Sequence, residues 1–319
     1  MKVRLGYVSL PLTINITSSK TITYTVYKKT ENGFDKINSL IEENLDSLLK
    51  ILEYNYKNNI HFYRMTSNLI PLATLEEVKF DYIYPYIDKY KNIGKYANTH
   101  NIRIDMHPDQ FCILNSTNSK IVKNSINILE YSKKLLNAFD FNSPKIILHV
   151  GSSQGGKKKS LSRFRNNFRK LDKNIQDKIV LENDDKVFSV IDVLDLSKEL
   201  NIPMVLDYHH YLCNNNGEKI EDLLQEIFNT WKDEVYPPKI HFSSPKSKLK
   251  KEFRSHHDYI NADEFIKFVE LAKSYTNELD IMIEAKAKDF ALFKLIRELK
   301  YLTNYKFIDD TTFVIADER

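Results

Sequence analysis

The sequence is poor in cysteine and contains no long hydrophobic run. Only two cysteines, Cys112 and Cys213, occur in 319 residues. This excludes the disulfide framework of a small secreted domain and leads us to expect a reducing, cytoplasmic setting. No apolar stretch is long enough to span a bilayer, and the first residues contain no segment of the signal-peptide type. We therefore expect no membrane association, and each cysteine packed as a small hydrophobic side chain.

What is present is enough for a large globular fold. Hydrophobic residues make up 42% of the chain, so a sizeable core can form, and the net charge of +4 is modest. The length suits one large α/β barrel or two ordinary domains. Because no stretch has the composition of a linker, we expect a single domain over residues 1–319.

Short apolar runs that end in imidazole or carboxylate side chains recur along the chain. In residues 203–210, an apolar run leads directly into Asp207, Tyr208, His209 and His210. This pattern is typical of a buried parallel strand that delivers metal ligands, because charge is rarely left at such a position unless it is paired or bound to metal. Five further runs share the pattern: residues 105–107, 147–149, 180–182, 239–242 and 281–284.

Alternating strand and helix patterns predict the fold. Strands are expected at residues 2–7, 61–65, 102–106, 145–148, 178–181, 203–206, 239–242 and 280–283. Helical spacing follows at residues 37–52, 82–100, 121–139, 161–171, 187–200, 220–230, from 261 and at 290–301. The Thr- and Tyr-rich segment 13–32 is expected to be a long loop with some β propensity. Eight strand–helix units predict a (β/α)8 (TIM) barrel of the α/β class.

The C-terminal strand ends of such a barrel converge on one face, where active sites are found. Imidazole and carboxylate ligands together suit Mn²⁺, Zn²⁺ or Fe²⁺, and so many of them match two or three ions, the arrangement used in phosphoryl displacement. We expect Mn²⁺, with Zn²⁺ or Mg²⁺ as alternatives. His61 and His100 fall at the other end of the barrel and are assigned to structure. The candidate ligands are His107, His149, Glu182, Asp207, His210, His241, His256 and Glu284.

Several neighbouring side chains have two interpretations. An isolated strand-end histidine is more often structural, but six such runs at equivalent positions favour a site. His209 is expected to face a phosphate or a carboxylate, and Tyr208 and Tyr211 are expected to pack in the core. Lys239 precedes His241 by two residues, so its side chain points into the barrel. There it either binds substrate phosphate beside the metals, with or without modification, or forms a salt bridge with Glu284 or Asp207.

Positive charge is concentrated in two places. Residues 141–171 contain no acid, and a second basic run follows residue 245. A charge run is usually a solvated face, but two runs beside the metal-bearing rim favour a track for a phosphate backbone. The amide and aromatic side chains of Gln110, Phe111 and Tyr7 are suited to wedge into a distorted duplex. The cations expected to contact DNA phosphates are Lys157, Lys158, Lys159, Arg163, Lys246 and Lys248.

With these features the chain resembles a known family, the UV damage endonucleases, which are related to endonuclease IV. The resemblance rests on RLGY at residues 4–7, MHPDQF at 106–111, LHVG at 148–151, LEND at 181–184, LDYHH at 206–210, KIH at 239–241, RSH at 254–256 and EAK at 284–286. It implies a metal-dependent (β/α)8 barrel that nicks duplex DNA immediately 5′ to cyclobutane pyrimidine dimers and (6-4) photoproducts, leaving a 3′-hydroxyl and a 5′-phosphate.

The resemblance also implies roles for individual residues. The eight candidate ligands would hold the metals, and Glu182, His149 and Lys239 would be catalytic. Gln110 and Phe111 would insert at the lesion, assisted by Tyr7. Two departures bear on lesion preference: Phe111 stands where some members carry Tyr, and no asparagine follows closely after Tyr7.

The expected partner is UV-damaged double-stranded DNA, bound by a monomer. The alternatives are a metal-dependent TIM-barrel sugar isomerase, an abasic-site endonuclease and a catalytically inactive DNA-binding module. A sugar isomerase gives no role to the basic runs or to Gln110 and Phe111. An inactive module is disfavoured because the ligand set is complete.

Overall fold

The computed structural model describes residues 1–316 and contains the predicted ring of parallel strands. Hydrogen bonds connect the strands in the order β2-β3-β4-β5-β6-β7-β8-β1. Each of these strands is followed by at least one helix, as expected for a (β/α)8 barrel. The strands are β1 (Lys2–Tyr7), β2 (Phe62–Met65), β3 (Arg103–Met106), β4 (Lys145–His149), β5 (Ile179–Glu182), β6 (Met204–Asp207), β7 (Lys239–Phe242) and β8 (Glu278–Ile283).

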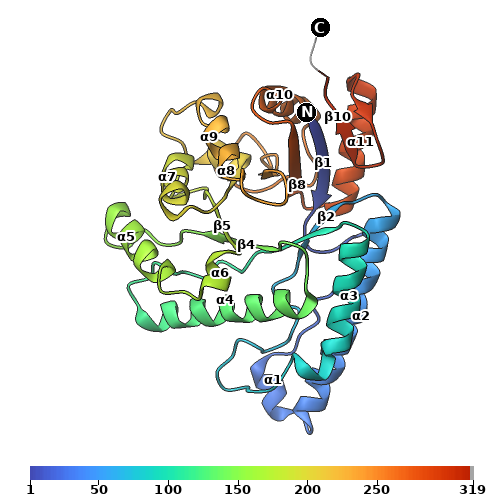
Figure 1. Ribbon diagram of the computed structural model, residues 1–319, viewed down its shortest axis with the longest axis vertical. Helices are drawn as coiled ribbons and strands as arrows, with labels where there is room; N and C mark the ends of the chain where they lie inside the picture. Colours follow the sequence, from blue (N-terminus) through green and yellow to red (C-terminus); the bar gives the residue numbers. More distant parts are fainter. Residues whose placement is uncertain (317–319) are drawn as a thin grey trace.

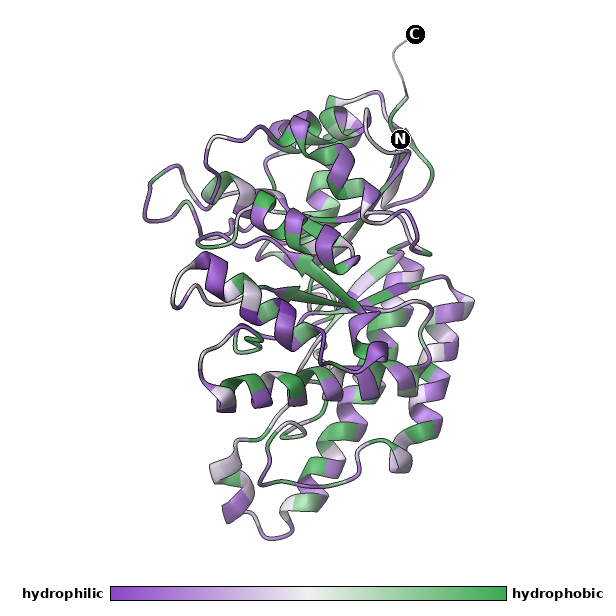
Figure 2. Ribbon diagram, turned by 60° about the vertical axis from the view of Figure 1, so that its left-hand side comes forward, coloured by the Kyte–Doolittle hydropathy of each residue, from purple (hydrophilic) through white to green (hydrophobic). Residues whose placement is uncertain are grey.

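Helices cover the outside of the strands (Figure 1). Their apolar faces turn inward against the strands, and polar residues predominate on their outer faces (Figure 2). The main hydrophobic cluster extends from Val3 to Ile315. The helices outside the strands are α2 (Gly33–Lys57), α3 (Ile87–Thr99), α4 (Ser119–Phe139), α5 (Lys157–Phe168), α6 (Lys173–Gln176), α7 (Val190–Leu200), α8 (Tyr208–Cys213), α9 (Leu224–Asn229), α10 (Ala262–Ala272) and α11 (Lys288–Leu302).

Polar side chains fix where several of these helices begin. The side chain of Asn118 accepts a hydrogen bond from the backbone of Lys120 at the start of α4, and Asn261 does the same for Glu264 at the start of α10. Such caps satisfy backbone donors that have no partner inside the helix. They therefore set the lengths of the loops that carry the barrel rim.

The barrel interior is filled in layers and is unusually rich in charge. Near the N-terminal strand ends, Arg4 and Arg103 both bind Asp280. One layer higher, Lys239 binds Asp105. Because side chains alternate along a strand, the next inward position after Asp105 is 107 and the next after Lys239 is 241. Apolar side chains fill the rest of these layers in two clusters: Ile147, Val180, Val205 and Trp231 on one side, and Val8, Phe62 and Met282 on the other.

The barrel closes in a way that the sequence did not predict. A C-terminal hairpin, β9 (Lys306–Phe307) and β10 (Thr312–Val314), places β10 antiparallel beside the first half of β1. Figure 1 shows β1 and β10 next to one another. The side chain of His61, just before β2, contacts Asp309 in the hairpin at 2.7 Å. In the described residues, the backbone pairing between this end of the sheet and β2 is a single bridge, from Val8 just after β1 to Arg64, beside the contact of the Tyr7 and Tyr63 rings.

The segment 13–32 is corrected from a loop with β propensity to a loop that contains a helix, α1 (Tyr24–Lys29). Thr and Tyr favour strands on average, but the side chain of Thr23 accepts a hydrogen bond from the backbone of Val26 and starts a helical turn. At the start of the segment, the backbone N–H groups of Leu12 and Thr13 donate to Asp289 on α11. These two bonds tie the beginning of the loop to the barrel.

Two further structural expectations, for Cys112 and for His100, are confirmed. Cys112 is buried, and burial raises the pKa of its thiol to about 12, as for an inert core side chain. His100 bonds to the carbonyl of Tyr96 at the end of α3, away from the C-terminal strand ends. Within residues 1–316 no helix is long and apolar enough to cross a membrane.

Candidate metal centre

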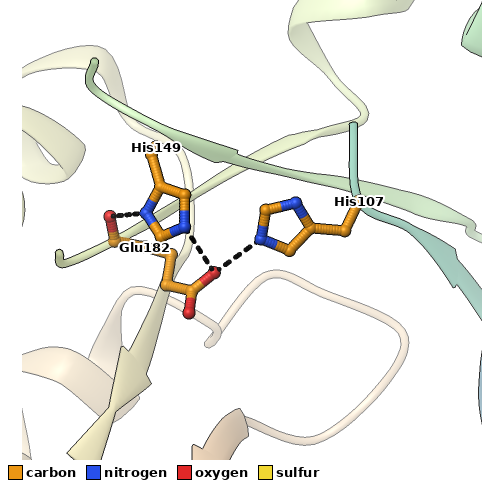
Figure 3. A group of neighbouring side chains, drawn as sticks. All are labelled: His107, His149 and Glu182. Atoms are coloured by element: carbon orange, nitrogen blue, oxygen red, sulfur yellow. Dashed lines mark hydrogen bonds and ion pairs between the residues drawn. The ribbon is translucent and has the colours of Figure 1, made fainter. Parts of the chain in front are cut away.

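Glu182 lies at the centre of the histidine cluster on the barrel rim. It ends β5 and is fully enclosed, with 1% of its surface exposed. Its Oε2 atom is 3.0 Å from Nε2 of His107, which follows β3, and 3.7 Å from Nε2 of His149, which ends β4. Figure 3 shows both rings turned toward the same carboxylate oxygen. These three residues can hold one divalent cation.

The other carboxylate oxygen of Glu182 faces a second group. Its Oε1 atom is 2.9 Å from Nδ1 of His241 on β7. Glu182, His241 and Asp207, which ends β6, bring their ligand atoms within 4.8 Å of one another. The two groups share Glu182, so its carboxylate would take part in holding a cation in either group.

Two more candidate ligands, Glu284 and His210, lie beside Glu182 and His241. Nδ1 of His241 also lies 3.3 Å from Glu284, which follows β8. Arg64 at the end of β2 binds the same carboxylate of Glu284. His210 lies 3.8 Å from Glu182, and its backbone N–H donates to Asp207 at 2.7 Å. The cluster of candidate ligands is therefore assembled from several different strands and from the positions just after them.

His256 approaches the cluster from a loop. Its ring centroid is 6.3 Å from that of His210 and 5.4 Å from that of His209. The expectation that His209 faces a phosphate or a carboxylate is wrong. His209 is buried, with its Nε2 atom 3.6 Å from Sγ of Cys213, and burial lowers its pKa to about 4. Tyr208 packs against Phe242 and Phe268 in the core, as expected.

Burial and neighbouring charges shift the pKa values of the cluster in different directions. Burial lowers the pKa values of His149 and His241, which favours the neutral imidazole, the form that ligates a metal. Burial opposes ionisation of Glu182, yet His241 and His149 hold its pKa well below its usual range. Burial also acts on His210, but Asp207 and Glu182 raise its pKa to about 9. A cation bound there takes the place of that proton.

The donor set fits divalent cations for a further reason. Among residues 1–316, the buried Oδ2 atom of Asp207 and the buried Nε2 atom of His241 have no hydrogen-bond partner. A buried polar atom without a partner is unfavourable, and such atoms occur mainly where a ligand, ion or water binds. Imidazole nitrogen and carboxylate oxygen in this ratio are the ligands of Mn²⁺, Zn²⁺ and Fe²⁺.

Lys239 does not pair with Glu284 or Asp207. Its ammonium donates to Asp105 at 2.8 Å, and both side chains are buried one layer below the histidines. Burial lowers the pKa of Lys239, while the adjacent Asp105 opposes that shift. The contact with Asp105 favours a positively charged Lys239, because like charges side by side in a buried site repel one another.

The expected lesion-probing residues divide into two groups. Gln110 and Phe111 are exposed on the loop after His107, and Phe111 keeps 67% of its surface accessible. Tyr7 must be corrected. Strand alternation turns its ring to the outside of the barrel, where it is fully buried and its hydroxyl donates to Asn55 of α2. It cannot reach DNA from there.

The predicted phosphate contacts also divide. Lys158, Lys159 and Lys248 are exposed. Lys157 pairs with Asp192 at 2.6 Å and Lys246 with Glu252 at 3.4 Å, so part of their charge is compensated. Arg163 is half-buried, and its guanidinium donates to the backbone carbonyls of Asn115 and Gln154, which holds two rim loops together.

Sequence reasoning missed two residues of the site. Arg64 lies at the end of β2 and binds Glu284, and Asp105 neutralises Lys239. Both were detectable by the alternation that was applied to Lys239, because Asp105 stands two residues before His107. Arg64 is the last inward-facing residue of β2, although as a cation it does not qualify as a metal ligand.

The chain is similar to known proteins over nearly its whole length. A family model described as UV-endonuclease UvdE matches residues 3–313. A UV DNA damage endonuclease of Bacillus cereus (strain B4264) is 41% identical over 311 residues, covering 96% of this chain and 97% of that protein.

Two solved structures are also similar. The crystal structure of SacUVDE has a TM-score of 0.84 and 37% identity, over 94% of this chain and 99% of that one. Endonuclease IV from Thermus thermophilus has a TM-score of 0.57 and 11% identity, over 80% and 95%, and shows a shared fold alone.

Proposed function

Because the chain belongs to the UV-endonuclease UvdE family and is a DNA-repair enzyme that cleaves phosphodiester bonds of UV-damaged DNA, we propose how its rim performs that cleavage. The reaction is hydrolysis of the bond immediately 5′ to a cyclobutane pyrimidine dimer or a (6-4) photoproduct. It leaves a 3′-hydroxyl and a 5′-phosphate. The observation that supports this best is the pair of ligand groups that share the buried carboxylate of Glu182.

Divalent metal ions held by these groups, two or three Mn²⁺ in this proposal, would polarise the phosphate and bring the pKa of water toward ~7. The chain's own residues fix the geometry. Glu182 faces His107 and His149 with one oxygen and His241 with the other. Arg64 restrains Glu284, and the backbone of His210 restrains Asp207. His256 completes the set from its loop. Lys239 supports the cluster from below through Asp105 rather than by contact with substrate.

Recognition of the lesion is assigned to the loop after His107. Gln110 and Phe111 are exposed beside the metal centre, where they can enter a stack that a photoproduct has already weakened. Lys158, Lys159 and Lys248, with smaller contributions from Lys157 and Lys246, would contact the phosphate backbone on either side. Raising salt from low to moderate concentration should then weaken binding of irradiated duplex by orders of magnitude.

The decisive experiment separates chemistry from binding. Glu182→Ala and His149→Ala should abolish nicking of a labelled, UV-irradiated duplex and retain binding to it. Phe111→Ala should leave the metal centre intact and weaken the preference for binding irradiated over undamaged duplex. Full nicking by Glu182→Ala would remove the shared carboxylate from the mechanism.

The same assay distinguishes the remaining possibilities. Protein stripped with a chelator and reloaded with Mn²⁺, Zn²⁺ or Mg²⁺ identifies the metal that restores nicking. A duplex with one abasic site tests the abasic-site alternative, and cleavage there at the rate seen with photoproducts would make lesion preference broader than proposed. We further propose that the chain is a single domain and acts in the cytoplasm as a monomer. Analytical ultracentrifugation with and without DNA would measure the mass and so test the monomer.

A further inference from the structure

A groove outside the metal centre is lined by both cations and aromatic rings. Two adjoining cavities, of about 390 and 440 Å³, share the side chains of Tyr259 and Lys294. Each volume falls in the range of ordinary ligand pockets. We call the pair the α11 groove, because Lys294 and much of the second cavity belong to α11. The charged and aromatic side chains that line it include Lys248, His257, Tyr259, Phe290, Lys294 and Arg297.

One end of the α11 groove opens beside the metal-bearing rim. His257 lines the groove and directly follows the candidate ligand His256. The carbonyl of His257 accepts a hydrogen bond from the backbone of Lys286, two residues after Glu284. The groove and the metal centre are therefore built on the same two loops, after β7 and β8.

The charge of the groove favours an anionic ligand. Lys248, Lys294 and Arg297 line it, against the single carboxylate of Glu264. Glu298 pairs with Lys294 from the following turn of α11 and offsets part of that charge. Positive charge remains in excess, and no carboxylate lines the second cavity. An excess of this kind attracts phosphate groups.

The aromatic rings favour a ligand with flat faces. Tyr259 and Phe290 keep 36% and 48% of their surfaces exposed, although rings of this size are usually buried. The ammonium of Lys294 lies 5.5 Å from the centre of the Tyr259 ring. Exposed rings alternating with cations form the surfaces on which single-stranded nucleic acids stack their bases.

We propose that the α11 groove binds single-stranded DNA, with bases stacked on Tyr259 and Phe290 and phosphates at Lys248, Lys294 and Arg297. Its use rests on the proposed function, because a nick beside a lesion frees one end of a strand close to the groove entrance. A duplex cannot offer unstacked bases to these rings, so the groove selects an unpaired strand.

The test is binding of a labelled, undamaged oligothymidylate of about six nucleotides to the metal-loaded full chain, measured by fluorescence anisotropy. Tyr259→Ala and Phe290→Ala should each weaken affinity about fivefold or more, as loss of a stacking ring does. Arg297→Gln should weaken affinity and flatten its dependence on salt. The matched controls are Tyr301→Ala, which removes an aromatic ring that is 89% exposed on the same helix, and Lys267→Gln on α10.

Unchanged oligonucleotide affinity in all three groove variants would overturn the proposal, and it is also the result expected if the groove binds a protein segment. Equal losses in the controls would likewise overturn it, because the binding would then be spread over the surface. Nicking of irradiated duplex is measured in parallel. Wild-type protein that binds the oligonucleotide through the groove but does not nick would contradict the proposed function and leave the groove assignment standing.

Discussion

Single residues inside this barrel are charged where most barrels are apolar, and below the metal-binding rim these charges are paired. Asp280 forms ion pairs with Arg4 and Arg103, Asp105 with Lys239, and Glu284 with Arg64. Replacing one partner in such a pair leaves an uncompensated charge in a low-dielectric interior. The pairs below the rim thus hold the strand ends in the positions that the metal ligands need.

Lys239→Met should destabilise the protein by about 3 kcal/mol or more. The substitution leaves the buried Asp105 carboxylate with Arg103, at 3.3 Å, as its cation and with one backbone donor, the N–H of Lys145. Urea denaturation of the metal-free protein measures the change. The double variant Lys239→Met with Asp105→Leu should recover most of the loss, because two apolar side chains replace the pair. A single variant as stable as the wild type would contradict the ion pair.

Tyr7→Phe should lower the free energy of unfolding by about 1–2 kcal/mol and leave lesion preference unchanged. The reason is that the Tyr7 hydroxyl donates to the buried Oδ1 atom of Asn55 at 2.8 Å, and no solvent replaces that bond. Thermal unfolding and the nicking assay are measured on the same preparation. A stable variant with reduced lesion preference would restore Tyr7 as a DNA-contacting residue.

At the scale of helices and strands, the close approach of α3 and α4 is set by a glycine. A Cβ atom on Gly94 would lie 1.6 Å from the backbone oxygen of Phe139 at the end of α4. Backbone cannot yield as a flexible side chain does. The two helices therefore pack at a distance that only glycine permits, and Tyr90 stacks edge-on against the Phe139 ring beside it.

Gly94→Ala should destabilise the protein by about 3 kcal/mol, the upper range of overpacking substitutions. The sign of this change in the free energy of unfolding is informative, because Gly→Ala at an uncrowded position of a helix stabilises a protein by up to about 1 kcal/mol. Asn92→Ala, at an exposed position of the same helix, is the control and should change stability by less than about 0.5 kcal/mol. Chemical denaturation of both variants gives the comparison. Stabilisation by Gly94→Ala would mean that α3 and α4 are further apart than described.

The strand–helix units could be predicted from the sequence, because period-two and 3.6-residue patterns report burial directly. The β9–β10 hairpin could not, because strands of two and three residues carry no periodicity. The helix α1 was missed because a single cap at Thr23 overrode strand propensity. The ligand set was predictable from strand ends, whereas the internal partners of Arg163 and Tyr7 depend on neighbours distant in sequence.

For the whole molecule, the joint between β1 and β2 depends on the C-terminal hairpin. The carbonyl of Thr311 accepts from the backbone of Leu5, and Asp309 contacts His61. Asp309 also accepts from the backbone N–H groups of Thr311 and Thr312 at 2.9 and 2.7 Å. One carboxylate therefore organises the turn that fills the gap in the barrel.

Asp309→Asn should weaken this joint most at neutral pH. Burial would raise the pKa of Asp309, but hydrogen bonds from His61 and from the hairpin backbone hold it below its usual value. Since the folded state has the lower pKa, the carboxylate stabilises the protein above about pH 4 and loses that effect as pH falls through the folded pKa. Because the group is only partly buried, we expect a loss of about 1 kcal/mol at pH 7.

The measurement is the unfolding midpoint of wild type and Asp309→Asn between neutral and acidic pH. The difference between the two proteins should shrink on acidification below about pH 4. Asp310→Asn, the neighbouring carboxylate on the same turn, is the control. A difference that stays constant down to the lowest pH would show that the charge of Asp309 does not stabilise the hairpin.

The position of β1 between β8 and β10 has a consequence for biosynthesis. β1 leaves the ribosome long before either neighbour exists, since its hydrogen-bonding partners are residues 278–283 and 312–314. During translation its backbone edge stays open to other chains, which makes the nascent protein a candidate for chaperone protection. Closure is a late event, and a stalled or prematurely terminated product that lacks residues 312–314 would display an unpaired first strand.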